Sequence, residues 1–304
     1  MANTKSKKTT AKKSTSKAKA VATKSAKTAK VETATTSAAA IAKGGNPFKG
    51  FFAKKCDKDE NILTIFKSPK IWGAIAGELV GTMLLTILML TLGVYQPLYV
   101  LIGMIGIAMA VYAFSGAHLN PAVTVGMMAS RRVSAIRGVL YIVAQVVGAW
   151  LGLIILSGFR GLGENAAELP AITALVADKT FWPNLFIEFF GASIIGYFFC
   201  RAQSYRTAKG AFTYAAIVAG GTVLATLFCI VISSNYVSLQ NNFILNPAIA
   251  IMEQIFPATA ENADLGTLLG DVALAALTYI IIPMLGGVIG FTVADASKKL
   301  AGEE

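Results

Sequence analysis

The sequence is poor in charge and in the side chains that most catalysts need. Only 14% of its 304 residues are charged, against about a quarter in an ordinary soluble domain. It has one histidine, no cluster of residues at metal-ligand spacing and no recognisable pairing of a nucleophile with a base. These absences argue against an enzyme, and we expect no metal ion and no cofactor.

Cysteine is scarce as well. The three cysteines are Cys56, Cys200 and Cys229, and their spacing matches no metal or redox motif. An odd number without a pattern does not indicate a disulfide framework, and two of the three lie in apolar runs. We expect them to be reduced and to have a structural role.

What the chain has in quantity is apolar sequence. Hydrophobic residues make up 55% of it, and its mean hydropathy is +0.62. A bilayer crossing needs about 20 consecutive apolar residues. Runs of this kind predict an all-α membrane protein with six transmembrane helices, within residues 71–95, 98–114, 138–159, 181–200, 210–252 and 272–294.

The positive charge is concentrated at the N-terminus. Residues 1–70 hold 17 lysines and four acidic residues, whereas the remaining 234 residues hold 10 basic and 12 acidic ones. Residues 1–46 contain almost no large apolar side chain, so we expect a largely disordered cytoplasmic tail. Attraction to anionic lipid headgroups is a second interpretation. Nucleic acid is not an expected partner, since no aromatic precedes Phe48.

A three-residue pattern, Asn-Pro-Ala, occurs twice. Each copy follows a long apolar run and opens about ten apolar residues, too few to cross a bilayer. Proline suits the first position of a helix, and asparagine suits the cap before it. Two such half-helices in matching halves predict a site near the membrane midplane. The copies are Asn120, Pro121, Ala122 and Asn246, Pro247, Ala248.

Other landmarks define two halves. Glu78 precedes the first Asn-Pro-Ala copy by 42 residues, and Glu188 precedes the second by 58. Three spans per half is an odd number, so the second half must be inverted across the bilayer. We therefore expect a tail at 1–70, a channel domain at 71–294 and a short cytoplasmic C-terminal tail at 295–304. Within the channel domain, the predicted repeats are 71–160 and 181–294.

Loop charges predict the orientation. Basic loops without acidic residues follow the first half-helix and join spans four and five, whereas the loops of the other side are mainly acidic. The positive-inside rule then places both termini in the cytoplasm. The basic loop residues are Arg131, Arg132, Arg137, Arg201, Arg206 and Lys209.

Residues 115–124 read Ser-Gly-Ala-His-Leu-Asn-Pro-Ala-Val-Thr, and this stretch resembles the first signature of the aquaporin and glycerol-facilitator (major intrinsic protein) family. Glu78 and Glu188 also fall at landmarks of that family. The resemblance covers about residues 71–294. It implies a homotetramer in the plasma (inner) membrane, with one pore per subunit that passes water and small neutral solutes.

The two half-helices would meet by their positive N-termini at the centre of such a pore and repel cations. Asn120 and Asn246 would donate hydrogen bonds to a passing oxygen, and carbonyls of 116–119 and 242–245 would accept them. His118 is expected to pack in its loop, with a pH-dependent gate as the alternative. Glu78 and Glu188 are expected to accept hydrogen bonds from the free backbone N–H groups of the loops, with a proton relay as the alternative.

One position departs from the family. Its second motif continues with an arginine that forms the narrow filter, whereas here Ile249 follows Ala248. An ungapped count places the other filter residues at Val100, Ser234 and Phe243. A large aromatic at 243 is more typical of glycerol facilitators than of strict water pores. Glu253, four residues after Ile249, could add negative charge to the outer vestibule or point into headgroups.

The sequence therefore predicts a passive channel for glycerol-like polyols with some water. Loss of the filter arginine leaves open a pore for other solutes, such as urea, ammonia, peroxide or protonated organic acids. A non-conducting membrane scaffold for the basic tail is a further alternative. Two asparagines at matching positions argue against it, because a scaffold does not need two aligned donors.

Overall fold

The computed structural model describes residues 65–92, 96–160, 181–207, 209–234, 243–253 and 265–303. Residues 54–296 form one compact unit, and the fold is described for this unit. Most of the predicted N-terminal tail, Cys56 and the acidic loops lie outside the described residues. The described secondary structure is helical, which confirms the predicted all-α class.

Among the described residues, five helical segments are long and apolar enough to cross a membrane, against six predicted spans. The sixth predicted span, at 98–114, forms the helix α4, which has only 15 residues and is about 22 Å long at 1.5 Å per residue. The segments are α3 (Pro69–Leu92), α4 (Pro97–Val111), α6 (Ala135–Arg160), α7 (Phe181–Ala202), α8 (Ala211–Ile232) and the continuous run of α10 (Leu265–Ala276), η4 (Leu277–Ile281) and α11 (Ile282–Ala301).

Two of the described helices are short and lie at the Asn-Pro-Ala motifs. They are α5 (Pro121–Ala129) and α9 (Pro247–Glu253), and each follows an Asn-Pro-Ala asparagine as predicted. Proline opens both, because its fixed φ suits the first turn and its missing N–H would have no partner there. Farther along the chain, η4 is a π-helical turn that ends at Ile281, two residues before Pro283. Pro283 cannot donate to the Tyr279 carbonyl, which accounts for the irregular turn at this point.

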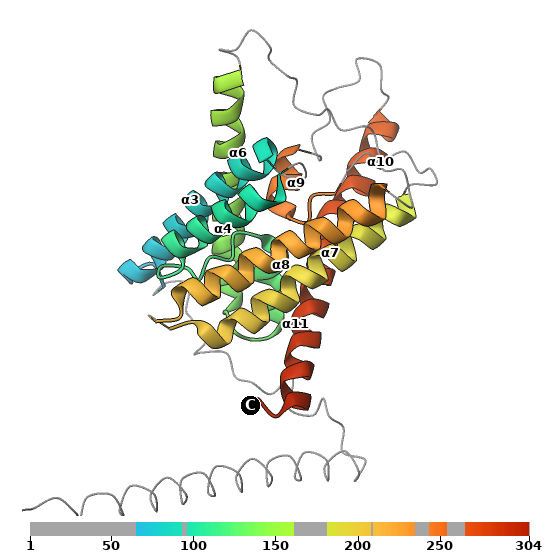
Figure 1. Cartoon of the computed structure of the whole chain (residues 1–304). Coiled ribbons are helices and arrows are strands. Elements are labelled where there is room, and N and C mark those ends of the chain that lie inside the picture. Colours follow the sequence, from blue (N-terminus) through green and yellow to red (C-terminus); the bar gives the residue numbers. More distant parts are fainter. Residues whose placement is uncertain are drawn as a thin grey trace, which may run out of the picture. The chain divides into compact units, whose positions relative to one another are not determined.

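The same close helix contact occurs in both halves. Helix α3 packs along α6 in the first half, and α11 approaches α7 closely in the second; α7 also lies beside α8 (Figure 1). A Cβ atom on Gly148 of α6 would collide with the carbonyl oxygen of Leu79 on α3, and one on Gly286 of α11 would collide with that of Phe189 on α7. Leu79 and Phe189 directly follow Glu78 and Glu188. The glycines therefore let the backbones approach at equivalent points of an inverted repeat.

We predict that Gly148→Ala destabilises the protein and that Gly158→Ala, on the same helix, does not. A Cβ at 148 meets backbone, which cannot move aside by a rotamer change, whereas nothing lies within 4 Å of one at 158. Overpacking costs about 1–3 kcal/mol, and an alanine in a helix recovers at most about 1 kcal/mol. Thermal unfolding in detergent should show a lower midpoint for Gly148→Ala only. Equal midpoints for the two variants would contradict this packing.

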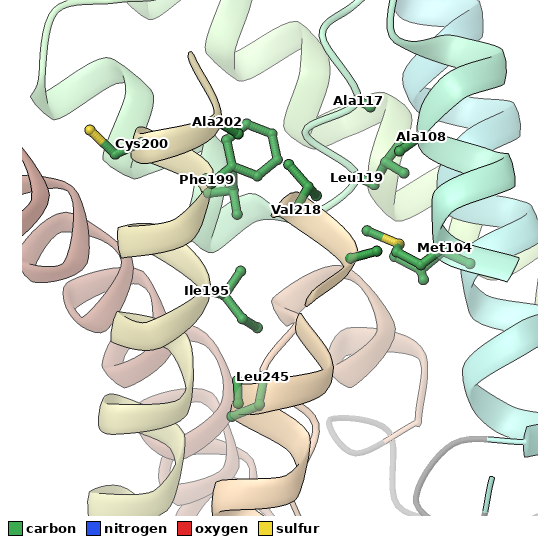
Figure 2. Close-up of a cluster of buried hydrophobic side chains, with 14 of the residues drawn as sticks. Met104, Ala108, Ala117, Leu119, Ile195, Phe199, Cys200, Ala202, Val218 and Leu245 are labelled. Atoms are coloured by element: carbon green, nitrogen blue, oxygen red, sulfur yellow. The ribbon is translucent and has the colours of Figure 1, made fainter. Parts of the chain in front are cut away.

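The outer faces of the helices are apolar. Large hydrophobic side chains are strongly exposed, among them Trp182 at 75%, Phe159 at 72% and Leu98 at 65%. Apolar side chains of this kind are compatible with the hydrocarbon core of a bilayer. The helices also satisfy their backbone hydrogen bonds internally, as a bilayer requires. Inside, a cluster of buried side chains joins α4, α7, α8 and the two loops that precede α5 and α9 (Figure 2). Cys200 and Cys229 are buried, and neither forms a disulfide with a described residue, which agrees with the predicted reduced state.

Candidate pore site

Both Asn-Pro-Ala asparagines cap the half-helix that follows them. The side-chain oxygen of Asn120 accepts the N–H of Ala122 at 2.8 Å, and that of Asn246 accepts the N–H of Ala248 at 3.1 Å. Each bond satisfies one of the backbone N–H groups that a helix N-terminus leaves without a partner. The caps were expected from the sequence, and they orient both side-chain amides.

The same two asparagines join the half-helices to each other. Asn120 Nδ2 donates to the carbonyl oxygen of Leu245 at 2.9 Å, and Asn246 Nδ2 donates to that of Leu119 at 2.9 Å. The two half-helices therefore meet at their N-termini, although the asparagines are 126 residues apart in the sequence. An amide nitrogen carries two hydrogens. The second hydrogen of each side chain has no partner among the described residues.

The backbone before each half-helix has an unusual conformation. Ala117, Leu119 and Leu245 have φ values of 52°, 54° and 59°, and Gly116 has a φ of 92°. Non-glycine residues rarely occupy this left-handed region, which costs about 1–2 kcal/mol for each of them. The segments are thus unwound as predicted, and neighbouring contacts must hold them in place.

Buried carboxylates provide the first of these contacts. Glu78 accepts the N–H groups of His118 at 2.9 Å and Leu119 at 2.7 Å, and the Nε2 of Gln145 at 2.7 Å. In the other half, Glu188 accepts the N–H groups of Ile244 at 2.6 Å and Leu245 at 3.1 Å. These described partners are all donors, so both carboxylates act as acceptors here. The contacts match the predicted bonding to the loop backbone.

Packing of two leucines provides the second contact. Leu119 and Leu245 point into the buried cluster shown in Figure 2 and are 0% and 3% exposed. A Cβ atom on Gly81 would lie 2.5 Å from a methyl group of Leu119, and one on Gly191 would lie 2.5 Å from a methyl group of Leu245. The glycines therefore leave room for the residue that precedes each pore asparagine.

His118 is packed rather than exposed. It is 1% exposed, and its ring lies edge-on to Tyr141 and Phe199, with centroid distances of 5.2 and 5.7 Å. Its Nδ1 lies 3.2 Å from the hydroxyl of Thr124. Its Nε2 has no hydrogen-bond partner in the part of the chain that is described. The contacts agree with packing in the loop, and the alternative of a gate stays a prediction.

The four predicted filter residues are not joined by described contacts. Val100 is buried in α4, whereas Ser234 is exposed just after α8. Phe243 belongs to the large buried cluster, and Ile249 belongs to a separate one with Ala149 of α6. The filter ring therefore stays a prediction. The side chain of Glu253 lies outside the described residues.

Some contacts at the site could not be predicted from the sequence. The hydroxyl of Tyr214 donates to the carbonyl oxygen of Gly116 at 2.6 Å across 98 residues. The Nη2 of Arg206 donates to the carbonyl oxygen of Ser115 at 3.5 Å across 91 residues. Neither α8 nor the loop before it carries a motif that points to the first re-entrant segment, so the sequence held no signal for these pairs.

Two capped half-helices that meet by their N-termini inside a bundle of apolar spanning helices define a multi-pass membrane protein with two re-entrant segments. The family model described as "Major intrinsic protein" matches residues 65–296. The chain therefore belongs to the major intrinsic protein family, whose members are channels. This finding confirms the family resemblance.

Individual relatives match over short stretches. Aquaporin-1 of Ovis aries is 46% identical over 67 residues, which cover 22% of this chain and 25% of the relative. Aquaporin PIP2-5 of Oryza sativa subsp. japonica is 42% identical over 97 residues, which cover 25% and 34%. The chain thus spans a quarter to a third of the length of these relatives. Among solved structures, the aquaglyceroporin from Plasmodium falciparum has 17% identity and a TM-score of 0.46, with 75% of this chain and 96% of that chain covered.

Proposed function

We propose that this protein is a passive channel for small neutral solutes, chiefly glycerol-like polyols, with some passage of water. The observation that carries the proposal is the pair of asparagines at the meeting point of α5 and α9. Asn120 and Asn246 each use one amide hydrogen across the repeat. The second hydrogen is then the donor offered to a hydroxyl or water oxygen.

The site would select neutral solutes by exchange of hydrogen bonds. A hydroxyl group accepts from the asparagines and donates to carbonyls of the unwound segments, such as those of Ala117 and His118. The half-helix N-termini are partly positive and oppose cations. An ion would lose its hydration shell without sufficient replacement, whereas a polyol would exchange one set of bonds for another. Pro121, Ala122, Pro247 and Ala248 hold the asparagines in this geometry.

A second candidate is a pore altered for other solutes, and Ile249 favours it. Ile249 is 2% exposed and packs in an apolar cluster, and it stands where the family's second motif has an arginine, so a constriction at this position would lack a guanidinium. With Val100 and Phe243 it would form an apolar wall, with Ser234 opposite. Such a wall would favour urea, ammonia, peroxide or protonated organic acids over highly hydrated species.

The proposed setting follows the family. We infer a homotetramer in the plasma (inner) membrane, with both termini cytoplasmic and one pore in each subunit. The channel domain of this proposal comprises residues 71–294, with repeats at 71–160 and 181–294. In the structure, α11 runs from Ile282 to Ala301.

Light scattering of proteoliposomes after a glycerol osmotic jump tests the proposal. Fast shrinkage followed by fast reswelling, relative to empty liposomes, is the result expected of a glycerol channel. Fast shrinkage alone would indicate a water pore. If neither phase exceeds the control, polyol conduction is wrong, and urea and weak acids become the next solutes to measure.

Deletion of residues 2–46 should leave glycerol permeability per protein unchanged. The family model begins at residue 65, and the described pore contacts lie beyond that point. The same liposome assay, normalised to the amount of reconstituted protein, measures the effect. A drop of more than twofold would show that the tail takes part in conduction.

A further inference from the structure

Arg206 lies against the first re-entrant segment. It follows the short helix η2 (Gln203–Tyr205) between α7 and α8. Its Nη2 donates to the carbonyl oxygen of Ser115 at 3.5 Å, and its Cζ and Nη2 lie 2.9 Å from the place where a Cβ of Gly116 would be. Arg206 is exposed although its bond to Ser115 is partly buried, and the end of the segment that its guanidinium borders is called the inner mouth below.

Hydrogen bonds to the backbone hold this arrangement in place. The hydroxyl of Tyr112, just after α4, donates to the carbonyl oxygen of Thr207 at 2.7 Å, next to Arg206. The hydroxyl of Tyr214 donates to the carbonyl oxygen of Gly116 at 2.6 Å, and the two tyrosine rings are 5.0 Å apart. The Arg206 backbone and the mouth are therefore fixed by the same tyrosine pair.

The charge on Arg206 is not neutralised in the described part of the chain. Asp295 forms its ion pair with Arg132, and the carboxylates of Glu78 and Glu188 are bound to donors of the re-entrant segments. No acidic side chain among the described residues pairs with Arg206. A partly exposed cation without a counter-ion raises the potential at a narrow opening, because low-dielectric walls weaken screening.

We propose that Arg206 is a specificity-determining residue that keeps cations, hydronium included, out of the pore from its inner mouth. The inference rests on the proposed channel function. The predicted outer constriction has Ile249 in place of an arginine, so a fixed guanidinium at the opposite end would take over charge exclusion. A unit charge about 10 Å away, at an effective dielectric constant near 20, lowers the population of a monovalent cation by roughly tenfold or more.

The test compares proton and glycerol flux in liposomes that contain the full-length protein. Pyranine reports internal pH after an external pH step, with K+ and valinomycin present to clamp the voltage. Arg206→Gln should raise proton flux about tenfold and leave glycerol flux within about twofold, since a neutral solute does not respond to the field. Arg206→Leu is a second variant without the charge, and its glycerol flux reports whether it is folded.

Two matched variants separate this role from others. Arg206→Lys keeps the charge, and Lys209→Gln removes a charge from the same loop at an exposed side chain that has no described hydrogen bond to the re-entrant segment; both should match the wild type. An unchanged proton flux in Arg206→Gln, or an equal rise in Lys209→Gln, would overturn the proposal. So would equal rises in glycerol and proton flux, which would mean that Arg206 is a steric plug. Failure of the wild type to pass glycerol would count against the proposed function alone, because the proton assay is read independently.

Discussion

Replacing Glu78 with glutamine is expected to disrupt the first re-entrant segment far more than the matched change at Glu188 disrupts the second. One oxygen of Glu78 accepts the Leu119 N–H at 2.7 Å and the Gln145 amide at 2.7 Å. In the variant the NH2 group replaces one of the two oxygens, so it faces either the His118 N–H or both the Leu119 N–H and the Gln145 amide. Each buried donor left without an acceptor costs about 1–3 kcal/mol, a large part of a total stability of about 5–15 kcal/mol.

Glu188→Gln should have a smaller effect and lower the free energy of unfolding by about 1 kcal/mol. One oxygen of Glu188 already lies 2.6 Å from the Ile244 nitrogen and 3.4 Å from the Leu245 nitrogen. A glutamine carbonyl in its place can accept from both. The measurement is the fraction of each variant that stays monodisperse in detergent after heating. If Glu78→Gln is as stable as the wild type but conducts protons differently, the carboxylate is a relay rather than a support.

Ile249→Arg is expected to lower glycerol flux by about tenfold or more and water flux much less. Ile249 is 2% exposed and packs with Ala149 and Ala248, so an arginine there would find no acceptor in the apolar cluster. Burial of an unpaired charge is costly, and the side chain would turn into the pore. There it would narrow the constriction, and excluding a few atoms from a fitted site changes rates by about 10–200-fold.

Stopped-flow light scattering with glycerol and with an impermeant osmolyte gives the two permeabilities. Ile249→Leu is the control, because a swap that conserves volume usually costs less than about 1.5 kcal/mol and adds no charge. It should resemble the wild type in both assays. Equal or higher glycerol flux in Ile249→Arg would show that position 249 does not lie at the constriction.

The helices and the placement of the asparagines follow from local chemistry. Uncharged runs of about 20 residues have few alternatives to a spanning helix, because lipid leaves no other partner for the backbone. An asparagine followed by proline caps a helix through bonds within two residues, as Ala122 and Ala248 show. These features depend on neighbours in the chain, so the composition and the motifs could predict them.

The length of α4 was less predictable. Residues 98–114 are uncharged throughout, and hydropathy therefore indicated a full span. The helix ends at Val111, and the next residues turn so that Ser115 and Gly116 can start the re-entrant segment. That end is set by tertiary bonds, including the one from Tyr214 to Gly116. Hydropathy is averaged over neighbouring residues, so it contains no information about a partner that lies 98 residues away in the sequence.

The sequence by itself determined the membrane class, the family and the two half-helices, since each is written in runs or motifs of neighbouring residues. Only the tertiary structure decided how these parts meet: Asn120 bonds to Leu245, Asn246 to Leu119, and Arg206 to Ser115. It also placed Ile249 in an apolar cluster. These pairings arise from the inverted packing of two halves, and that packing joins residues whose separation in the chain bears no relation to their distance in space.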